Sequence, residues 1–347
     1  MPYPVKSYAA HDATTPLSPY DFNRRDLGPD DVLIDIRYCG VCHSDLHFAK
    51  NDLEDSVYPL VPGHEITGVV AKVGANVTRH RFGDRVGVGV MVNACRHCVE
   101  CEAGEEQFCR HSIGTYNADD RDGTRTQGGY STRVVVDQHF VLRVPDALPL
   151  DAAAPLLCAG VTTWSPLKTW NAGPGKRLGV IGLGGLGHMA VKLGAALGCH
   201  VTVVSTSNRK KADAERFGAH DFLVSTDVPA MKASRERFDL ILNTVSAPHE
   251  IDKQLRMLAR DGTMVMLGLT NDPVPVDILR LMDRRRRLAS SPIGGIRETQ
   301  EMLDFCAEHK IAAEIETIRM DEINTAYERM LKSDVRYRFV VDMASLA

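Results

Sequence analysis

The sequence lacks a large excess of charge of either sign. Its 41 basic and 45 acidic residues leave a formal net charge of −4 over 347 residues, with histidines counted as neutral. Proteins that bind nucleic acid usually carry a broad basic field. The one dense basic run here spans residues 283–287, and we interpret it as a solvated loop. We therefore expect no nucleic-acid partner.

Long apolar runs are also missing. The N-terminus starts Met-Pro-Tyr-Pro and has no apolar stretch of signal-peptide length. The most apolar later stretch, residues 178–197, is interrupted by glycines, His188 and Lys192, whereas a membrane helix needs about 20 predominantly apolar residues. We expect no membrane partner and a cytoplasmic protein. With 44% hydrophobic residues and no internal repeat, the chain is long enough for two globular domains.

Cysteine, in contrast, is plentiful, with nine residues. Four of them follow the spacing C-x2-C-x2-C-x7-C, namely Cys95, Cys98, Cys101 and Cys109. In a large chain that we expect to be intracellular, this spacing is typical of metal binding rather than of disulfides.

A glycine-rich stretch, residues 178–187, reads LGVIGLGGLG. Gly182, Gly184 and Gly187 have the GxGxxG spacing of a dinucleotide-binding turn, in which glycines permit a tight turn, close approach of a pyrophosphate, and close packing of helix on strand. Alone, the motif also fits an ordinary glycine-rich turn. Its context favours the nucleotide reading, because a strand precedes it, a helix-compatible segment follows at 188–197, and another strand follows at 200–205.

The pattern of elements changes near Pro155. Before it, alternating and β-branched runs predict an all-β, loop-rich region without strong helices, with strands at 31–38, 66–73, 85–92 and 130–144. At 31–38 the apolar residues Val32, Ile34, Ile36 and Tyr38 alternate with Leu33, Asp35 and Arg37, which is mostly the period of a half-buried strand.

After Pro155, strands alternate with helices, which predicts a doubly wound parallel sheet. The predicted strands lie near residues 178, 200, 221, 238, 262 and 287. Two amphipathic segments follow at 297–309 and 321–333, and then a terminal strand at 337–343.

A second set of metal-binding residues is scattered along the chain. Cys42, His64 and Cys158 supply two thiolates and one imidazole, a set known for catalytic zinc, which keeps its fourth position for water or substrate. Taken singly, each fits a structural role as well: Cys158 as an apolar core cysteine and His64 as a hydrogen-bonded turn residue.

Motifs along the whole chain resemble the zinc-dependent medium-chain alcohol dehydrogenases, most closely their cinnamyl-alcohol-dehydrogenase branch. The resemblance is carried by CGVCHSDLH (39–47), YPLVPGHEITG (58–68), GDRVGVG (83–89), CRHCVECEAGEEQFC (95–109), TQGGYS (126–131), CAGVTTWSPLK (158–168), GLGGLGHMAVK (182–192) and VRYRFVVDM (335–343). It implies an α/β protein. A GroES-like β-rich catalytic domain would span residues 1–153, completed by 293–347, and a Rossmann domain would span 154–292.

The resemblance also implies roles for matching residues. Cys42, His64 and Cys158 would bind catalytic zinc, with Glu65 as a possible exchanging fourth ligand. Asp45 would orient His64, a support that metal-bound imidazoles usually need. Ser44 and His47 would relay a proton, with Asp52 close to that relay. Cys95, Cys98, Cys101 and Cys109 would form a closed structural site, so two zinc ions per subunit are expected.

Cofactor choice is set where the second Rossmann strand ends. An NAD enzyme would place Asp or Glu there, but residues 205–210 read STSNRK. Hydroxyls and cations suit a 2′-phosphate, so we expect NADP(H), although the segment also fits a solvated basic helix start. The residues expected to bind the cofactor are Gly182, Gly184, Gly185, Leu186, Gly187, Ser205, Thr206, Ser207, Arg209, Lys210 and Thr162.

Together these features imply a zinc-dependent NADP(H) alcohol dehydrogenase. It would be a broad aldehyde reductase acting on aliphatic, benzylic or cinnamyl-type aldehydes, because Gly114 and Pro292 replace the aromatic residues of the plant lignin enzymes. Leu53, Tyr58 and Trp164 are candidate pocket residues, although each fits core packing equally well. The resemblance also implies a homodimer formed through the edge of the Rossmann sheet. The alternatives are an NAD-linked zinc polyol or sugar dehydrogenase and a non-catalytic dinucleotide-binding protein.

Overall fold

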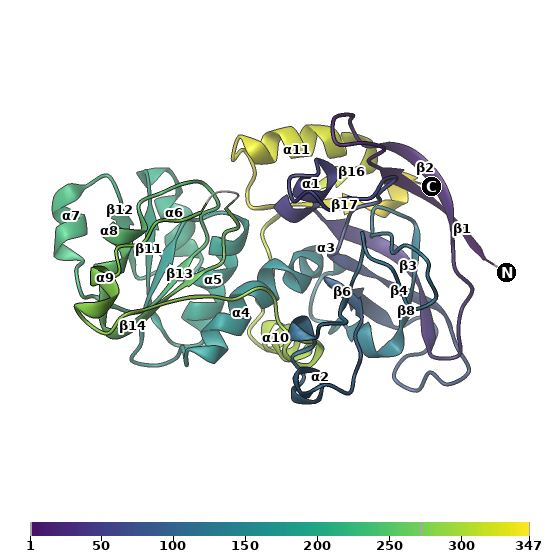
Figure 1. The fold of residues 1–347 in the computed structure, drawn as a ribbon, viewed down its shortest axis with the longest axis horizontal. Coiled ribbons are helices and arrows are strands. Elements are labelled where there is room, and N and C mark those ends of the chain that lie inside the picture. The colour runs from purple at the N-terminus through teal and green to yellow at the C-terminus, as the bar shows by residue number, and fades with distance from the viewer. Residues whose placement is uncertain (1, 271–272, 347) are drawn as a thin grey trace. The chain divides into compact units, whose positions relative to one another are not determined.

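The computed structural model describes residues 2–270 and 273–346 (Figure 1). The chain forms two compact units, one of residues 1–158 with 294–347 and one of residues 159–293. The first unit thus keeps residues 154–158, which the sequence analysis placed in the Rossmann domain. The reason is packing, because the buried 3₁₀ helix Ala154–Leu157 lies against strands of the first unit's sheet.

The first unit is built on a seven-stranded sheet. Six strands follow the order β16-β17-β3-β4-β5-β9, and β8 pairs with β3. A separate hairpin joins β1 to β2, and β6 pairs with β7. The strands are β1 (Tyr3–Ala9), β2 (Ser18–Arg24), β3 (Asp31–Gly40), β4 (Ile66–Val73), β5 (Arg85–Val88), β6 (Met91–Asn93), β7 (Ile113–Gly114), β8 (Arg133–Asp137), β9 (Leu142–Arg143), β16 (Ile315–Arg319) and β17 (Arg338–Asp342).

Five α-helices complete the described part of this unit: α1 (His43–Ala49), α2 (Val99–Ala103), α3 (Leu150–Ala153), α10 (Ile296–Glu308) and α11 (Ile323–Leu331). The last two correspond to the predicted amphipathic segments. In α10 the buried side chains recur every three or four residues at Thr299, Met302, Leu303 and Cys306, which is the period of one helix face.

Strand β3 lies at the centre of the sheet and differs from its prediction. In the predicted alternation Leu33 falls on the same face as Asp35 and Arg37, yet only 4% of it is exposed. Residues 31–34 of β3 are all buried, so both faces of the first half of the strand are covered. Strands β4, β8 and β17 pair along its two edges, and α3 and the 3₁₀ helix Ala154–Leu157 also contact the strand.

Other predicted strands of this unit are interrupted. The run 85–92 divides into β5 and β6, and the run 130–144 divides into β8 and β9 around a 3₁₀ helix, Gln138–Phe140. The sequence analysis missed β1 and β2, whose prolines and polar residues give a weak strand pattern. It also missed α1, which has seven residues and is too short for a clear helical period.

The second unit is a six-stranded parallel sheet in the order β12-β11-β10-β13-β14-β15. Its strands are β10 (Arg177–Ile181), β11 (His200–Ser205), β12 (Asp221–Val224), β13 (Phe238–Asn243), β14 (Leu258–Met266) and β15 (Arg287–Ser290). Numbered along the chain, this order is 3-2-1-4-5-6, that of the dinucleotide-binding doubly wound fold. The predicted fold class is confirmed.

Helix α4 precedes the first of these strands and the other helices of the unit connect them; Figure 1 shows helices lying along the sheet. They are α4 (Ala159–Thr169), α5 (Gly185–Ala196), α6 (Lys211–Arg216), α7 (Val228–Ala233), α8 (Ile251–Leu255) and α9 (Leu279–Met282). Because helices cover a parallel sheet on its faces, its central strands read as apolar runs. In β11, for example, residues 201–204 are all buried.

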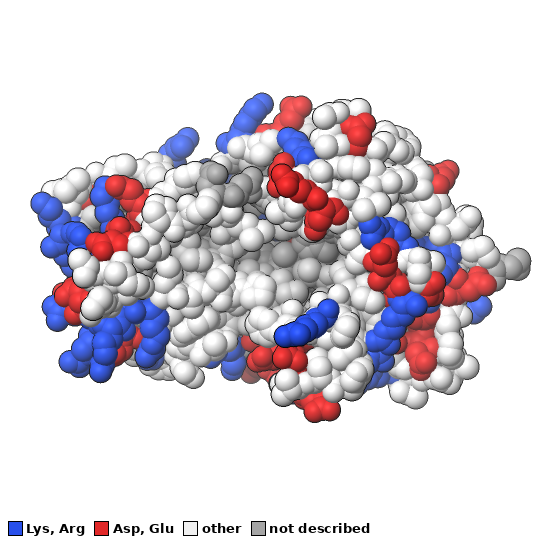
Figure 2. Space-filling view, viewed as in Figure 1, with Lys and Arg blue, Asp and Glu red and all other residues white. Residues whose placement is uncertain are grey.

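The charged residues are interspersed on the face drawn in Figure 2, where acidic side chains lie among the basic ones. In the basic run 283–287, Arg284 pairs with Glu236 and Arg285 with Asp261, both at 2.8 Å. The interpretation of this run as solvated is wrong for Arg286, which is buried and donates to the Leu258 carbonyl at 2.8 Å. Of the helices in the described ranges, none is both long and apolar enough to cross a bilayer.

The glycines of the turn after β10 differ in the space available for a side chain. A Cβ on Gly187 would lie 2.0 Å from the Gly182 carbonyl oxygen, whereas a Cβ on Gly184 would meet no described atom within 4 Å. We predict that Gly187→Ala destabilises the protein without cofactor by about 1–3 kcal/mol, the usual cost of overpacking. Gly184→Ala is the matched control. Thermal or urea unfolding measures the stability of both variants. An equal free energy of unfolding in the two would contradict the close packing assigned to Gly187.

Candidate active site and metal sites

Helix α1 positions four of the predicted site residues. Cys42 is its N-cap, and the Cys42 amide donates to the Asp45 carboxylate at 2.9 Å, as in a capping box. Ser44 and His47 lie on the same short helix. A single capping interaction therefore fixes the start of the helix and the place of the Cys42 thiol.

Four potential ligands come together in the first unit. One ligand atom from each of Cys42, His64, Glu65 and Cys158 lies within 4.8 Å of the others. His64, Glu65 and Cys158 are buried, and Cys42 is partly buried. The two sulfurs are 3.9 Å apart. Two thiols, an imidazole and a carboxylate so close together fit a zinc ion, because their charged forms need a cation when buried.

Asp45 holds the His64 imidazole in place. Its carboxylate accepts from His64 Nδ1 at 2.9 Å and from the Gly63 amide at 3.0 Å, which leaves His64 Nε2 for a metal. Burial by itself lowers the pKa of His64. The Asp45 carboxylate raises this pKa by more than burial lowers it, so the net shift is upward. Gly63 is required here, since its φ is +103° and a Cβ would lie 2.8 Å from the Tyr130 ring.

Glu65 lies beside this group with one oxygen engaged. Its Oε1 accepts from the Arg338 guanidinium of β17, while its Oε2 has no hydrogen-bond partner in the described chain. Burial raises the pKa of Glu65 to about 7, against the opposing effect of Arg338. A buried carboxylate oxygen without a donor costs free energy, and a cation at the ligand group would supply its partner.

The two thiols of this group share a hydrogen bond. That bond lowers the pKa of Cys42 well below its ordinary value and raises the pKa of Cys158 well above it. One thiolate thus forms readily beside the other thiol, and a metal ion would replace the shared proton.

Of the predicted proton-relay residues, Ser44 lies next to the ligand group. Ser44 Oγ is 3.7 Å from Cys42 Sγ. His47 Nδ1 pairs with Asp52 Oδ2 at 2.7 Å, and both side chains are partly exposed, at 18% and 33%. Ser44 therefore sits at the ligand group, whereas the pair of His47 and Asp52 reaches solvent.

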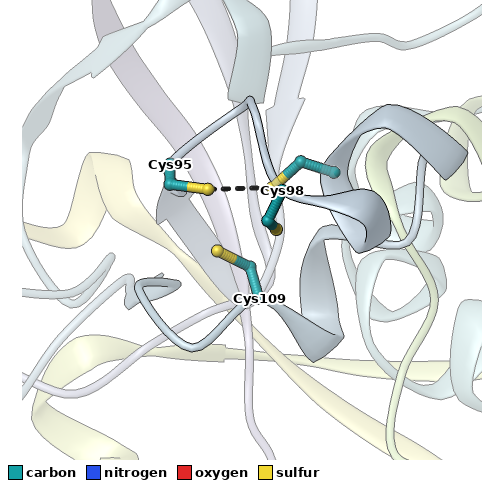
Figure 3. A group of neighbouring side chains, drawn as sticks. Cys95, Cys98 and Cys109 are labelled. Atoms are coloured by element: carbon teal, nitrogen blue, oxygen red, sulfur yellow. Dashed lines mark hydrogen bonds between the residues drawn. The ribbon is translucent and has the colours of Figure 1, made fainter.

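The four remaining predicted ligands form a second group, with one sulfur from each of Cys95, Cys98, Cys101 and Cys109 within 4.8 Å. Figure 3 shows the labelled thiols turned toward one another. Helix α2 starts after Cys98 and contains Cys101, and Cys109 follows the 3₁₀ helix Glu106–Phe108. A hydrogen bond from the His97 amide lowers the pKa of Cys95 to about 6. Four thiols without a carboxylate or imidazole fit a closed zinc site.

The predicted cofactor residues lie at the carboxyl ends of β10 and β11 in the second unit. Gly182 has a φ of +88°, and Gly184 is the N-cap of α5, which starts with Gly185 and Leu186. The N-terminus of a helix after such a turn favours phosphate.

The segment after β11 reaches back to this turn. Lys210 Nζ donates to the Leu183 carbonyl at 2.8 Å, so the basic segment and the glycine turn adjoin. Ser205 ends β11, Thr206 is exposed, and Ser207 accepts from Arg209 Nε at 3.4 Å. Thr162 is buried on α4, which packs against α5.

The candidate pocket residues have different surroundings. In the first unit, Leu53 is 46% exposed, and the Tyr58 hydroxyl donates to the Ala49 carbonyl at 3.0 Å. In the second unit, Trp164 is buried on α4.

Sequence reasoning missed Arg338 and the phenols that surround Asp45. Tyr130 donates to Asp45 at 3.4 Å, and Tyr327 lies 3.5 Å from the Tyr130 hydroxyl. Arg338 lies in VRYRFVVDM and Tyr130 in TQGGYS, two of the motifs that carry the resemblance. The motifs contained these residues, but only the tertiary contacts give them partners.

Comparisons with known proteins agree with this geometry. Residues 28–146 match the alcohol dehydrogenase GroES-like domain, and residues 185–308 match the zinc-binding dehydrogenase family. The chain is 56% identical over 344 residues to NADP-dependent alcohol dehydrogenase C 1 of Mycolicibacterium smegmatis, with 99% of each chain covered. It is 52% identical over 345 residues to the aldehyde reductase YahK of Escherichia coli, also with 99% of each covered.

Among solved structures, the fold matches a cinnamyl alcohol dehydrogenase of Sorghum bicolor, SbCAD4, with a TM-score of 0.95, 48% identity and 98% of each chain covered. The chain belongs to the zinc-binding alcohol dehydrogenase family. The resemblance predicted from the motifs is confirmed.

The two ligand groups predict separable effects of zinc loss. We expect two zinc ions per chain in the unmodified protein and one in each of Cys42→Ala and Cys98→Ser, measured by elemental analysis. Cys42→Ala should lose activity yet stay folded, because its site is the open one, whereas Cys98→Ser should mainly lower thermal stability. Fewer than two metals in carefully purified protein would contradict this assignment.

Proposed function

We propose that the chain is a zinc-dependent, NADP(H)-linked alcohol dehydrogenase that works as an aldehyde reductase of broad substrate range. The observation that carries this proposal is the buried group of Cys42, His64, Glu65 and Cys158, in a chain whose second unit has the dinucleotide-binding strand order. A zinc ion held there would supply Lewis-acid polarisation of the substrate oxygen.

The chain's own residues would then handle the proton. The Ser44 hydroxyl lies beside the ligand group and would donate its proton to the substrate oxygen. Asp52 accepts from His47 Nδ1, which leaves His47 Nε2 to exchange a proton with solvent. Asp45 keeps the His64 ring oriented through its hydrogen bond.

Cofactor preference rests on residues 205–210. Ser205, Thr206 and Ser207 offer hydroxyls, Arg209 and Lys210 offer positive charge, and no carboxylate stands among them to repel a 2′-phosphate. The hydrogen bond from Lys210 to Leu183 places this ammonium next to the glycine turn. The relative from M. smegmatis is named as NADP-dependent, which supports the same choice.

Broad substrate range is proposed from the small side chains at two positions. Gly114 and Pro292 stand where the plant lignin enzymes carry aromatic residues, so less aromatic area is available to select a planar substrate. Differences of methylene size in an apolar pocket are worth only about 1–3 kcal/mol, and discrimination among aldehydes should be modest.

Assembly and location are proposed from the sheet edge and from the cysteines. Strand β15 is the last strand in the described sheet order and pairs with β14, so its other edge is available for a second copy, and we propose a homodimer. All nine cysteines carry free thiols, which suits a reducing compartment such as the cytoplasm.

The proposed function predicts a specific pattern of initial rates. With butanal, benzaldehyde and cinnamaldehyde, kcat/KM should be similar within about two orders of magnitude and higher with NADPH than with NADH. Ser205→Asp should weaken NADPH by like-charge repulsion and shift the preference toward NADH.

Three results would contradict parts of this proposal. Equal kcat/KM with NADPH and NADH would contradict the proposed preference for NADP(H). A preference of several orders of magnitude for one aldehyde would contradict the proposed broad substrate range. If the protein oxidises mannitol with NAD but reduces none of the aldehydes with NADPH, the result would favour a polyol dehydrogenase.

The proton path predicts a separate effect. We expect His47→Ala to lower kcat by about 10²- to 10⁴-fold, the range typical of acid–base groups, with little change in the Kd of NADPH. The pH profile of kcat should change shape. Lys50→Ala, which removes an exposed side chain at the end of α1, is the control. An unchanged rate and profile in His47→Ala would show that protons leave by another route.

A further inference from the structure

Glu106 is a buried acidic residue that belongs to neither ligand group. It starts the 3₁₀ helix between Cys101 and Cys109, and only 3% of it is exposed. Its Oε1 accepts from His139 Nε2 at 3.1 Å, and its Oε2 accepts from the Ile296 amide at 3.0 Å. Burial by itself raises the pKa of Glu106. These hydrogen bonds lower the pKa by more than burial raises it, so the net shift is downward and the carboxylate stays charged.

The Ile296 amide is the first of helix α10. The N-cap of this helix, Gly295, has no side chain to accept a hydrogen bond, and the first amides of any helix lack partners within the helix. Glu106 therefore caps α10 from a distant part of the sequence. A carboxylate at that end also interacts favourably with the helix dipole.

Two further contacts join the cysteine lobe, residues 95–109, to the same turn of α10. Arg297 donates from its guanidinium to the Ala103 carbonyl. A Cβ on Gly295 would lie 1.9 Å from the Gly104 carbonyl oxygen and 2.8 Å from Glu106 Oε2. The backbones of the lobe and of the helix start thus meet where only glycine fits.

This junction lies at a special place in the chain. The chain returns from the second unit to the first at Gly294, one residue before the N-cap of α10. The end of the returning segment is therefore held by the lobe that the four cysteines fold around.

We propose that the cysteine lobe anchors the returning segment through Glu106, so that metal in the lobe and order at the start of α10 are coupled. With the thiols bound to zinc, the 3₁₀ helix before Cys109 is fixed and Glu106 caps α10. When the lobe loosens, the cap is lost. By linkage, disturbing the start of α10 lowers the affinity of the lobe for zinc.

Hydrogen exchange of the purified zinc-loaded protein tests whether Glu106 caps α10. In Glu106→Gln, one of the two donors loses its acceptor, because an amide offers one oxygen and one NH₂ group. Exchange of the amides of residues 296–299 should become roughly 2- to 30-fold faster, the range expected for a lost helix cap. Exchange in α11 should not change. Glu105→Gln, at an exposed position in the same lobe, is the matched control.

Zinc release to a chromogenic chelator tests the reverse direction and does not depend on activity. In Gly295→Ala all four cysteines remain, yet the added methyl group would displace Gly104. One zinc ion should leave several-fold faster than from the unmodified protein, while release of the other should not change. The proposal is overturned if Glu106→Gln leaves exchange at 296–299 unchanged, or if Gly295→Ala releases both ions at the unmodified rates.

Discussion

The Asp45 carboxylate is the interaction on which the candidate active site depends. It accepts from the Cys42 amide, the Gly63 amide and His64 Nδ1, and is contacted by the Tyr130 hydroxyl. It thus joins the start of α1 to the turn before β4, and it orients one candidate ligand in each, Cys42 and His64. Buried polar networks are stable only when every member is satisfied, and Asp45, with no exposed surface, meets that condition.

The sequence predicted the second unit better than the first. Its strands are buried on both faces and separated by helices, so their apolar runs were distinct and all six were predicted. In the first unit, pairing and coverage decide burial, as at Leu33, which becomes buried because β3 is covered on both sides. Strands β1 and β2 gain their order from pairing with each other, which no local pattern reports.

The site followed a similar division. Spacing alone indicated that the four cysteines of residues 95–109 bind metal, because all four lie within a stretch of 15 residues. Cys42, His64 and Cys158 are far apart and needed the family resemblance. Arg338 and Glu106 could not be predicted, since a buried charge is recognised by its partners, and those partners, Glu65 and Ile296, are 273 and 190 residues away.

The position of Arg338 also has a consequence for the growing polypeptide on the ribosome. All eight candidate cysteine, histidine and glutamate ligands have been synthesised once Cys158 is added, but Arg338 is added 180 residues later (338 minus 158). At about 5–20 residues per second, this interval is roughly 9–36 seconds. Throughout it the Glu65 carboxylate has no guanidinium beside it, and β3 lacks the neighbouring strand β17. The nascent chain therefore holds a complete set of ligands before the charge that balances them exists.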